Sequence, residues 1–341
     1  MKIVVTGGLG FIGSHTVVEL QNEGFEVVAI DNLSNASEEV LNGIERITGT
    51  KPLFEKMDLR DKASVQQFFK KHNDVVGVIH FAASKAVGES VENPLLYYEN
   101  NINSLVYLLQ ELKELPKANF IFSSSCTVYG QAEKMPITED ASVQPAVSPY
   151  GNTKQIGEEI IADVVKVTNI NSVLLRYFNP IGAHPTAEIG ELPIGVPQNL
   201  VPFITQTAIG LREKLLVYGN DYPTPDGTAI RDYIHVVDLA KAHVVALKRL
   251  LEKQNADQLE IFNLGTGTGS SVLEVIAAFE KVSGQQLNYQ IVDRREGDIT
   301  SAYANTDKAN SVLGWKSQYN LEDGLASAWK WEQKIRSEQK T

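Results

Sequence analysis

Apolar and polar positions in the first half of the chain follow two alternating patterns. Lys2–Thr6 is a short β-branched run, whereas the apolar residues of Ser14–Glu23 recur with helical spacing. The first pattern is typical of a buried strand and the second of a helix that packs on one side. The alternation continues to Tyr177. It predicts an α/β protein with a parallel sheet, in which helices connect successive strands.

The predicted sheet has six parallel strands, and its order of elements is typical of a Rossmann-type, doubly wound fold. Ligands of such sheets bind at the carboxyl ends of the strands, so residues there are the first candidates for a site. The expected strands after Lys2–Thr6 are Glu26–Ile30, Pro52–Met57, Gly77–Phe81, Asn119–Phe122 and Ser172–Tyr177, and the expected helices include Glu38–Thr48, Ala63–Lys71, Pro94–Leu115 and Tyr150–Val167.

Beyond residue 180 the regular alternation fails. Prolines and glycines crowd Gly182–Pro202, and Gly219–Gly227 is expected to be a loop. We therefore expect a main domain over residues 1–180 and a smaller, interleaved α/β region over residues 181–341, with later core elements from about 231–264 joining the main domain. The polar end of the chain, Glu332–Thr341, is expected to be a frayed helix end.

Three glycines separate the first predicted strand from the first helix. Gly7, Gly10 and Gly13 give the spacing GxxGxxG, which allows a tight turn and a close approach of the backbone to a pyrophosphate at a helix N-terminus. Asp31 ends the second strand, about 20 residues after the loop, where a carboxylate can accept hydrogen bonds from a ribose. Turn residues would explain this pattern without a ligand, but the flanking strands and helix favour dinucleotide binding. Asp31 would repel a 2′-phosphate, which favours NAD over NADP.

Further candidates for cofactor contacts follow the later strands. Asp58 is a candidate for the adenine end, and the small Ala82 and Ala83 allow the backbone to lie against a cofactor. Lys85 is a candidate partner for a phosphate or ribose, although a solvated lysine would give the same pattern. The expected cofactor set also contains Phe11, Ile12, Asn32, Leu59, Phe81, Asn100, Ser123 and Tyr177.

The candidate catalytic residues are Ser125, Tyr150 and Lys154. Tyr150 and Lys154 are four residues apart, so on one helix their side chains share a face. A phenol titrates at about pKa 10, and a neighbouring ammonium would favour the phenolate that a base requires at neutral pH. Ser125 is expected to face Tyr150, and Lys154 to bond the nicotinamide ribose as well. Beside a nicotinamide, this set predicts hydride transfer coupled to removal of an alcohol proton.

Composition adds mainly exclusions. The 341 residues are 43% hydrophobic and 21% charged, as in ordinary globular proteins. A net charge of −11 disfavours nucleic acid and anionic membranes as partners, and no apolar run reaches the roughly 18 residues of a membrane span. The single Cys126 and the lack of metal-ligand spacing among the histidines predict a cytoplasmic protein without a disulfide or metal site. The helix Pro94–Leu115 is apolar on more than one side, which favours a homodimer.

Several long runs of residues occur in a characteristic order. They are TGGLGFIGSH from Thr6, DNLSN from Asp31, HFAASKAVGES from His80, YYENN from Tyr97, SSSCTVYG from Ser123, SPYGNTK from Ser148, RYFNPIGAHP from Arg176, GNDYPTPDGTAIRDYIHVVDLA from Gly219 and RREGD from Arg294. With these runs the chain resembles the extended short-chain dehydrogenase/reductase superfamily and, within it, the UDP-glucose 4-epimerases. The resemblance covers essentially the whole chain.

The resemblance implies reversible inversion at C4 of a UDP-hexose, which interconverts UDP-galactose and UDP-glucose on bound NAD. Tyr150 would remove the 4-hydroxyl proton while C4 gives up hydride, and Ser125 would position that hydroxyl or relay its proton. The resulting 4-keto sugar would swing and be reduced on its opposite face. Residues 1–180 would then bind NAD, and residues 181–341 mainly the nucleotide sugar.

The resemblance also assigns the contacts with the nucleotide sugar. Asn179 and Asn199 would contact it directly, and Asp298 would meet the uridine ribose. Arg231 and Arg295 would clamp the diphosphate, a role that suits the guanidinium fork. Without the resemblance, the arginines would be interpreted as surface ion pairs and Asn199 as a turn residue. The remaining expected substrate contacts are Ser125, Tyr150, Phe178, Leu200, Tyr218 and Ala302.

Substrate range and two rival functions stay open. In the family, the residue four positions after the aspartate of RREGD lines the sugar pocket, and the small Ala302 there leads to the hypothesis that UDP-GlcNAc and UDP-GalNAc also fit. A nucleotide-sugar 4,6-dehydratase needs an acidic residue beside the catalytic serine or threonine, and Ser125-Cys126-Thr127 supplies none. A non-catalytic, dinucleotide-sensing regulator need not retain Ser125, Tyr150 and Lys154 together.

Overall fold

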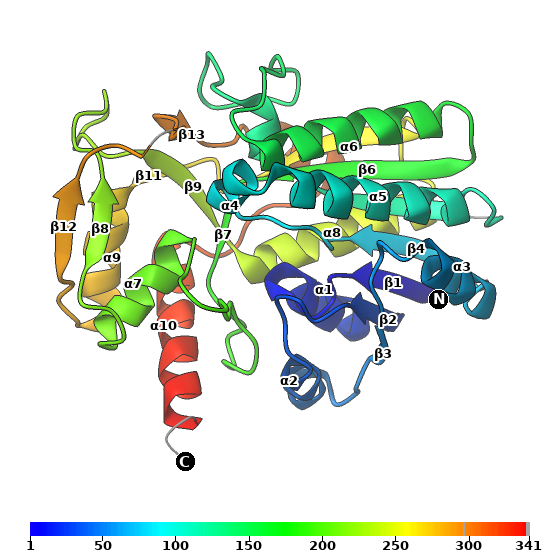
Figure 1. The fold of residues 1–341 in the computed structure, drawn as a ribbon, viewed down its shortest axis with the longest axis horizontal. Coiled ribbons are helices and arrows are strands. Elements are labelled where there is room, and N and C mark those ends of the chain that lie inside the picture. The colour runs from blue at the N-terminus through cyan, green and yellow to red at the C-terminus, as the bar shows by residue number, and fades with distance from the viewer. Residues whose placement is uncertain (117, 296, 339–341) are drawn as a thin grey trace.

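The computed structural model describes residues 1–116, 118–295 and 297–338. Within these residues the central element is a seven-stranded sheet in the order β10-β6-β5-β4-β1-β2-β3, and every pairing in it is parallel. Helices cover both of its faces (Figure 1). The predicted α/β fold with a doubly wound parallel sheet is confirmed. The strands are β1 (Lys2–Thr6), β2 (Glu26–Asp31), β3 (Leu53–Lys56), β4 (Val75–His80), β5 (Ala118–Ser125), β6 (Ile170–Tyr177) and β10 (Leu259–Leu264).

The two faces of the sheet form separate hydrophobic cores, because successive side chains of a strand point to opposite sides. In β1, Ile3 and Val5 pack with one set of helices and Val4 with the other. The first set is α1 (Phe11–Asn22), α2 (Glu39–Thr48) and α8 (Val236–Leu251), and the second is α3 (Lys62–Lys71), α5 (Pro94–Leu112) and α6 (Pro149–Val165). The sheet therefore lies between two helical layers. Because its strands are parallel, their carboxyl ends lie along the same edge.

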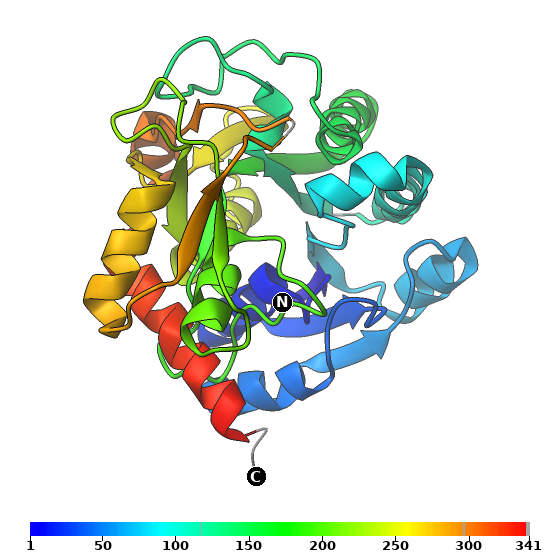
Figure 2. The same ribbon diagram turned by 60° about the vertical axis from the view of Figure 1, so that its left-hand side comes forward.

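The C-terminal elements gather on one side of the molecule, as Figure 2 shows in orange and red. They share a core that includes Ile204, Val217, Phe279 and Leu325. A small sheet runs β11-β9-β13, with β7 paired to β9, and β12 pairs with β8. The elements are β7 (Asn179–Ile181), α7 (Leu200–Ala208), β8 (Leu215–Tyr218), β9 (Ile230–His235), β11 (Gly269–Ser271), α9 (Val272–Ser283), β12 (Tyr289–Val292), β13 (Ser301–Ala302) and α10 (Leu321–Glu338), and the short helices elsewhere are α4 (Val87–Glu92), η1 (Cys126–Tyr129) and η2 (Ala309–Leu313).

The structure differs from the sequence predictions in three places. The main sheet has a strand beyond the six predicted, because Leu259–Leu264, within the later elements expected to join the main domain, pairs in parallel with β6. The segment at Arg231, in contrast, pairs with β7, β11 and β13 and joins the small sheet. The prediction of a frayed end was wrong for residues 332–338, since α10 continues to Glu338 and buries Glu332 at 3% exposure. Residues 339–341 of that predicted tail lie outside the described residues.

No helix in the described parts of the chain has the length and apolar character to cross a membrane.

Candidate active site

The glycine turn between β1 and α1 is built so that only small residues fit. Gly7 has a φ of 64°, and a Cβ atom on it would lie 2.8 Å from the Ala82 nitrogen. A Cβ atom on Gly13 would lie 2.1 Å from the Gly7 carbonyl oxygen. Gly10 is the N-cap of α1, and it makes no side-chain capping bond. The N-terminus of α1 therefore presents backbone N–H groups at the carboxyl edge of the sheet, an arrangement that suits a phosphate.

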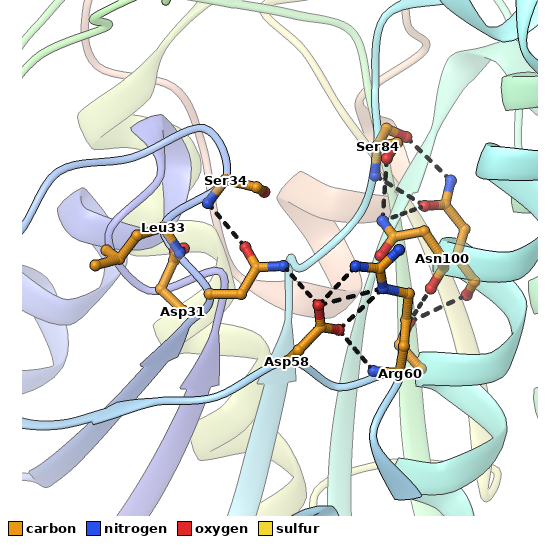
Figure 3. Close-up of polar contacts among 10 residues, drawn as sticks. Asp31, Leu33, Ser34, Asp58, Arg60, Ser84 and Asn100 are labelled. Carbon is orange, nitrogen blue, oxygen red and sulfur yellow. Dashed lines mark hydrogen bonds and ion pairs between the residues drawn. The ribbon is translucent and has the colours of Figure 1, made fainter.

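The residues predicted for the adenosine end lie together beside this turn (Figure 3). The Asp31 carboxylate accepts hydrogen bonds from the Leu9 nitrogen at 3.2 Å and the Leu33 nitrogen at 2.9 Å. Asn32 donates from Nδ2 to Asp58 at 3.2 Å. The three predicted residues from β2 and the segment after β3 thus share one edge.

Arg60 is a residue of this edge that sequence reasoning missed. It grips the Asp58 carboxylate with two guanidinium nitrogens, at 2.8 Å from Nη2 and 3.1 Å from Nε. The hydrogen bonds from Arg60 lower the pKa of Asp58 to about 2, so that carboxylate is charged at neutral pH. The side chain of Leu59, between them, belongs to a hydrophobic core, and only its backbone is left for a ligand.

The loop after β4 is held by asparagines of α5. Asn100 donates to the Ser84 hydroxyl at 3.1 Å (Figure 3). Asn101, which sequence reasoning missed, accepts from the Ser84 nitrogen at 2.8 Å and donates to the Thr153 hydroxyl at 3.0 Å. The loop with Phe81, Ala82 and Ala83 is therefore fixed to α5, which is bonded through Thr153 to α6, the helix of Tyr150 and Lys154.

Lys85, at the end of that loop, lies across from the C-terminal region. Its ammonium is 3.6 Å from the Glu191 carboxylate, and the Asn199 amide donates to the same oxygen at 2.6 Å. The lysine predicted for the cofactor and the asparagine predicted for the nucleotide sugar thus meet on Glu191. Sequence reasoning gave no role to Glu191, because a loop carboxylate has no pattern of its own.

Ser125, Tyr150 and Lys154 come together at the carboxyl end of β5. Ser148 caps α6 by accepting from the Gly151 nitrogen at 3.1 Å, which places Tyr150 in the first turn. Lys154 follows one turn later and donates to the Ser123 carbonyl at 2.6 Å. Ser125, the last residue of β5, accepts from the Thr127 nitrogen at 3.2 Å.

The electrostatics of this group differ from the sequence prediction. Burial raises the pKa of Tyr150 to about 12, and its hydrogen bond with Ser125 acts in the opposite direction. The Lys154 ammonium lies 5.9 Å from the centroid of the Tyr150 ring, and its hydrogen bond goes to the Ser123 carbonyl. Burial lowers the pKa of Lys154 itself to about 8, against the charge of Glu158. In this geometry Lys154 therefore does not offset the effect of burial on the pKa of Tyr150.

Two predicted cofactor residues, Ser123 on β5 and Tyr177 on β6, lie beside the catalytic residues. The hydroxyls of Ser123 and Tyr177 are hydrogen-bonded to each other, and both side chains are buried. Phe81 and Ile12 pack their side chains against the neighbouring core. Phe11 lies edge-on to His15, with 5.5 Å between ring centroids.

A cationic cluster lies on the C-terminal side of the site. Arg295 donates to the Asp298 carboxylate at 2.9 Å, and Arg231 approaches the same oxygen at 3.8 Å. The Arg295 guanidinium also lies 5.6 Å from the centroid of the Tyr218 ring. Two guanidinium groups and one carboxylate leave a net positive charge, which suits a diphosphate.

The other predicted substrate residues lie in or next to β7, α7 and β13. Asn179 begins β7 directly after Phe178, whose ring is buried with Val128 and Ala302. Ala302 is 2% exposed. Asn199 is the N-cap of α7 but makes no side-chain capping bond there, since its amide is turned to Glu191. Leu200 packs its side chain on the C-terminal core.

The fold and these side chains define a class of protein, the nucleotide-sugar enzymes with a Ser/Tyr/Lys set at the edge of a Rossmann-type sheet. The family model described as GDP-mannose 4,6 dehydratase matches residues 4–328, so the chain belongs to that broad family. Within it, the chain belongs to the UDP-glucose 4-epimerases, which are isomerases. It is 51% identical over 333 residues to the UDP-glucose 4-epimerase of Bacillus subtilis (strain 168), and the match covers 97% of each chain.

Solved structures agree with this assignment. The UDP-glucose-4-epimerase from Stenotrophomonas maltophila, with bound NAD and formylated UDP-arabinopyranose, is 44% identical and matches with a TM-score of 0.95 over 99% of each chain. The enzyme from Bifidobacterium longum, in complex with NAD+ and UDP, is 45% identical and matches with a TM-score of 0.93 over 98% of this chain and 99% of that one. Among the described residues, no group of histidine, cysteine or carboxylate side chains has the geometry of a metal site.

Proposed function

We propose that this protein interconverts UDP-galactose and UDP-glucose by oxidation at C4 to a 4-keto sugar and non-stereospecific return of the hydride. One observation supports the proposal most strongly. Ser125, Tyr150 and Lys154 lie at the same edge of the sheet as the glycine turn, and the arginine cluster lies on the C-terminal side of the site. The membership of the chain in the epimerase family supports the same reaction.

NAD fits the first half of this site, and when bound it supplies the hydride acceptor and a positively charged ring. The N-terminus of α1 would hold the pyrophosphate, and Asp31 would accept from the ribose of adenosine. We assign this binding to residues 1–180 together with α8 and β10, and the nucleotide sugar mainly to residues 181–341. The carboxylate of Asp31 would repel a 2′-phosphate, which favours NAD over NADP.

Tyr150 is the group that takes the proton of the 4-hydroxyl. The Lys154 ammonium and the positively charged ring that NAD would supply when bound would together favour the phenolate. Ser125 hydrogen-bonds the phenol. The two side chains would therefore meet the same sugar hydroxyl. Lys154 is fixed by its bond to the Ser123 carbonyl at 2.6 Å, and its remaining N–H groups would hold the cofactor ribose.

The arginine cluster explains how the sugar can rotate in the site while the nucleotide stays bound. Arg231 and Arg295 would grip the diphosphate with charge-assisted hydrogen bonds, and Asp298 would exchange part of its contact with them for the uridine ribose. The hexose would contact Asn179 and Asn199 by few, weaker bonds. A tightly held UDP and a loosely held hexose allow the 4-keto sugar to present either face to the returning hydride.

Ala302 supports a wider substrate range that includes UDP-GlcNAc and UDP-GalNAc. Its methyl group packs with Phe178 at the end of β13, so it takes up little of the space beside the sugar. Turnover of UDP-galactose without turnover of either N-acetylated sugar would refute this wider range.

A homodimer in the cytoplasm is the assembly that we propose. Helix α5 carries apolar residues on the side away from the sheet, where Ile102 and Val106 are half-buried, and Leu95 at its start is 80% exposed. A second copy of α5 would cover this face by isologous packing. Sedimentation of the purified protein tests the assembly directly.

The direct test of the activity uses purified protein and UDP-galactose, with no cofactor added. We expect the NMR spectrum of the mixture to show UDP-glucose until equilibrium is reached, because NAD stays bound through each cycle. If product forms only after NAD is added, the cofactor was lost in purification and the proposal stands. A 4-keto-6-deoxy sugar, or no reaction even with NAD, would refute it in favour of a dehydratase or a sensor.

A further inference from the structure

A buried ion pair lies directly behind the catalytic residues. Glu158 is on α6, one turn after Lys154, and Arg176 is on β6. The Arg176 guanidinium donates from both Nε and Nη2 to the two carboxylate oxygens of Glu158, with 2.9 Å for the bond from Nε. The exposed fractions of the side chains are 5% for Arg176 and 10% for Glu158. The predicted reaction does not use this pair, and a buried bidentate pair costs desolvation unless its geometry is well supported.

The same carboxylate is bonded to the end of strand β5. The Ser124 hydroxyl donates to Oε1 of Glu158, and Ser124 is 1% exposed. One turn earlier on α6, Lys154 donates to the Ser123 carbonyl at 2.6 Å. Helix α6 is therefore attached to the last residues of β5 at two neighbouring points, and Ser125 is the next residue along the strand.

The alternation of side chains along β5 makes this attachment relevant to the site. Phe120 and Phe122 pack in the core beneath α5 and α6, and Ile121 packs in the opposite core. Ser124 continues the first series, so its bond to Glu158 fixes the side of β5 that faces α6. Ser125 is the next residue and by the same alternation belongs to the opposite series.

Arg176 extends the attachment to the neighbouring strand. It lies directly opposite Ser124 in the register of β5 and β6. Its guanidinium lies 4.8 Å from the centroid of the Tyr129 ring, in the short helix that follows Ser125. The Tyr129 hydroxyl in turn donates to Asn263 of β10 at 2.6 Å. The carboxylate of Glu158 is thus the point at which α6, β5 and β6 are joined immediately behind the reacting groups.

We propose that Glu158 is a positioning residue for the epimerisation, which holds the end of β5 against α6 so that Ser125 and Tyr150 meet the same substrate hydroxyl. The inference rests on the proposed function. It assigns to Ser124 the transmitting contact and to Arg176 the support of the carboxylate. A displacement of about 1 Å at a reacting group can lower a rate about 100-fold, so a contact at this distance from the chemistry has a large effect.

Glu158 also balances the charge of Lys154. Three titratable groups face Lys154, namely Tyr150 and Glu158 from its own helix and His80 from β4. The charge of Glu158 raises the pKa of Lys154 against the effect of burial. Removal of that charge leaves the effect of burial unopposed, so the pKa of Lys154 falls and the ammonium is lost at a lower pH.

The test compares two variants with two matched controls. Glu158→Gln keeps the shape of the side chain and removes its charge. Its control is Glu260→Gln, which removes the carboxylate of another buried bidentate pair, with Arg249 at 2.7 and 2.9 Å, near the amino end of β10. Ser124→Ala removes only the hydroxyl that bonds Glu158. Its control is Ser172→Ala, which removes a hydroxyl on β6 that is fully buried and has no hydrogen-bond partner within the described residues.

We expect Glu158→Gln to lower kcat for UDP-galactose about 10- to 100-fold, and Ser124→Ala about 3- to 10-fold, with KM changed less than twofold, because misplacement affects the reacting groups and not the diphosphate contacts. The alkaline limb of the kcat profile of Glu158→Gln should move to lower pH. Both controls should keep kcat and the pH profile of the wild type, whatever their melting temperatures.

The outcomes separate this inference from the proposed function. A wild-type protein that does not epimerise UDP-galactose refutes the proposed function. If the wild type turns over and Glu158→Gln keeps its kcat and pH profile, or changes them only as Glu260→Gln does, the positioning role is refuted. If Glu158→Gln fails to fold, Ser124→Ala decides, and a kcat equal to that of Ser172→Ala refutes the role.

Discussion

Replacement of Gly13 by alanine tests whether the β1–α1 turn holds the cofactor. The added Cβ atom would lie 2.1 Å from the Gly7 carbonyl oxygen, 2.9 Å from the Gly7 carbonyl carbon and 3.0 Å from the Gly8 Cα atom. All three neighbours are backbone atoms, so no flexible side chain can move aside. The helix and the turn must separate by about 1 Å, and overpacking of this kind costs about 1–3 kcal/mol.

The separation acts on the N–H groups that would bind the pyrophosphate. If a similar free energy is lost from NAD binding, the affinity falls about 5- to 150-fold, since about 1.4 kcal/mol corresponds to a factor of ten. The assay is the NAD content of the purified protein, released by acid and measured by chromatography, together with turnover at increasing added NAD. We expect Gly13→Ala to be purified with little NAD and to need added cofactor for turnover.

Gly88→Ala is the matched control, because a Cβ atom on Gly88 meets nothing within 4 Å. It should retain the wild-type NAD content and activity. If Gly13→Ala retained as much NAD as the control and turned over without added cofactor, the reasoning from the turn geometry would be refuted.

Three further predictions follow from the site and its surroundings. Tyr150→Phe should lower kcat at least about 100-fold by removing the proton acceptor while the NAD content stays unchanged, and a variant that keeps its turnover would contradict the assigned base. Burial holds the pKa of His15 and His80 at about 3 and that of His243 at about 4, below the ordinary value of 6.5. The unfolded chain then binds more protons below pH 6.5, so the free energy of unfolding in urea should fall between pH 6.5 and 4, by up to about 1.4 kcal/mol per pH unit for each histidine; equal stability at pH 7 and 5 would contradict this. Ala302→Tyr should abolish turnover of UDP-GlcNAc and retain that of UDP-galactose, and equal losses for both sugars, measured as kcat/KM, would show that Ala302 does not set the range.

Much of the fold was predictable because its signals are local. The glycine spacing and the β-branched runs fix β1, α1 and β2, and the ends of the predicted strands bring Asp31, Asp58 and Ser125 to one edge. The four-residue spacing of Tyr150 and Lys154 is confirmed as one turn of α6. Patterns of this kind depend on neighbours in sequence and are therefore visible before the chain folds.

The features that sequence reasoning missed depend on contacts between distant segments. Glu191 meets Lys85 and Asn199 only after the loop beyond β7 returns to the sheet. The network of Asn101 joins two helices, and neither partner has a distinctive spacing. The raised pKa of Tyr150 arises from burial, which no four-residue motif reports. The strand at Arg231 was expected to join the main domain, and only its pairing with β7 places it in the small sheet.

In the proposed reaction a hydride leaves C4 and returns to the opposite face of the same carbon. Incubation of the protein with UDP-galactose carrying deuterium at C4, in ordinary water, tests it directly. The account predicts UDP-glucose with the deuterium still on C4, because a hydride on a bound cofactor does not exchange with water. Deuterium on C6 of a 4-keto-6-deoxy sugar, or its loss to solvent during product formation, would contradict the account.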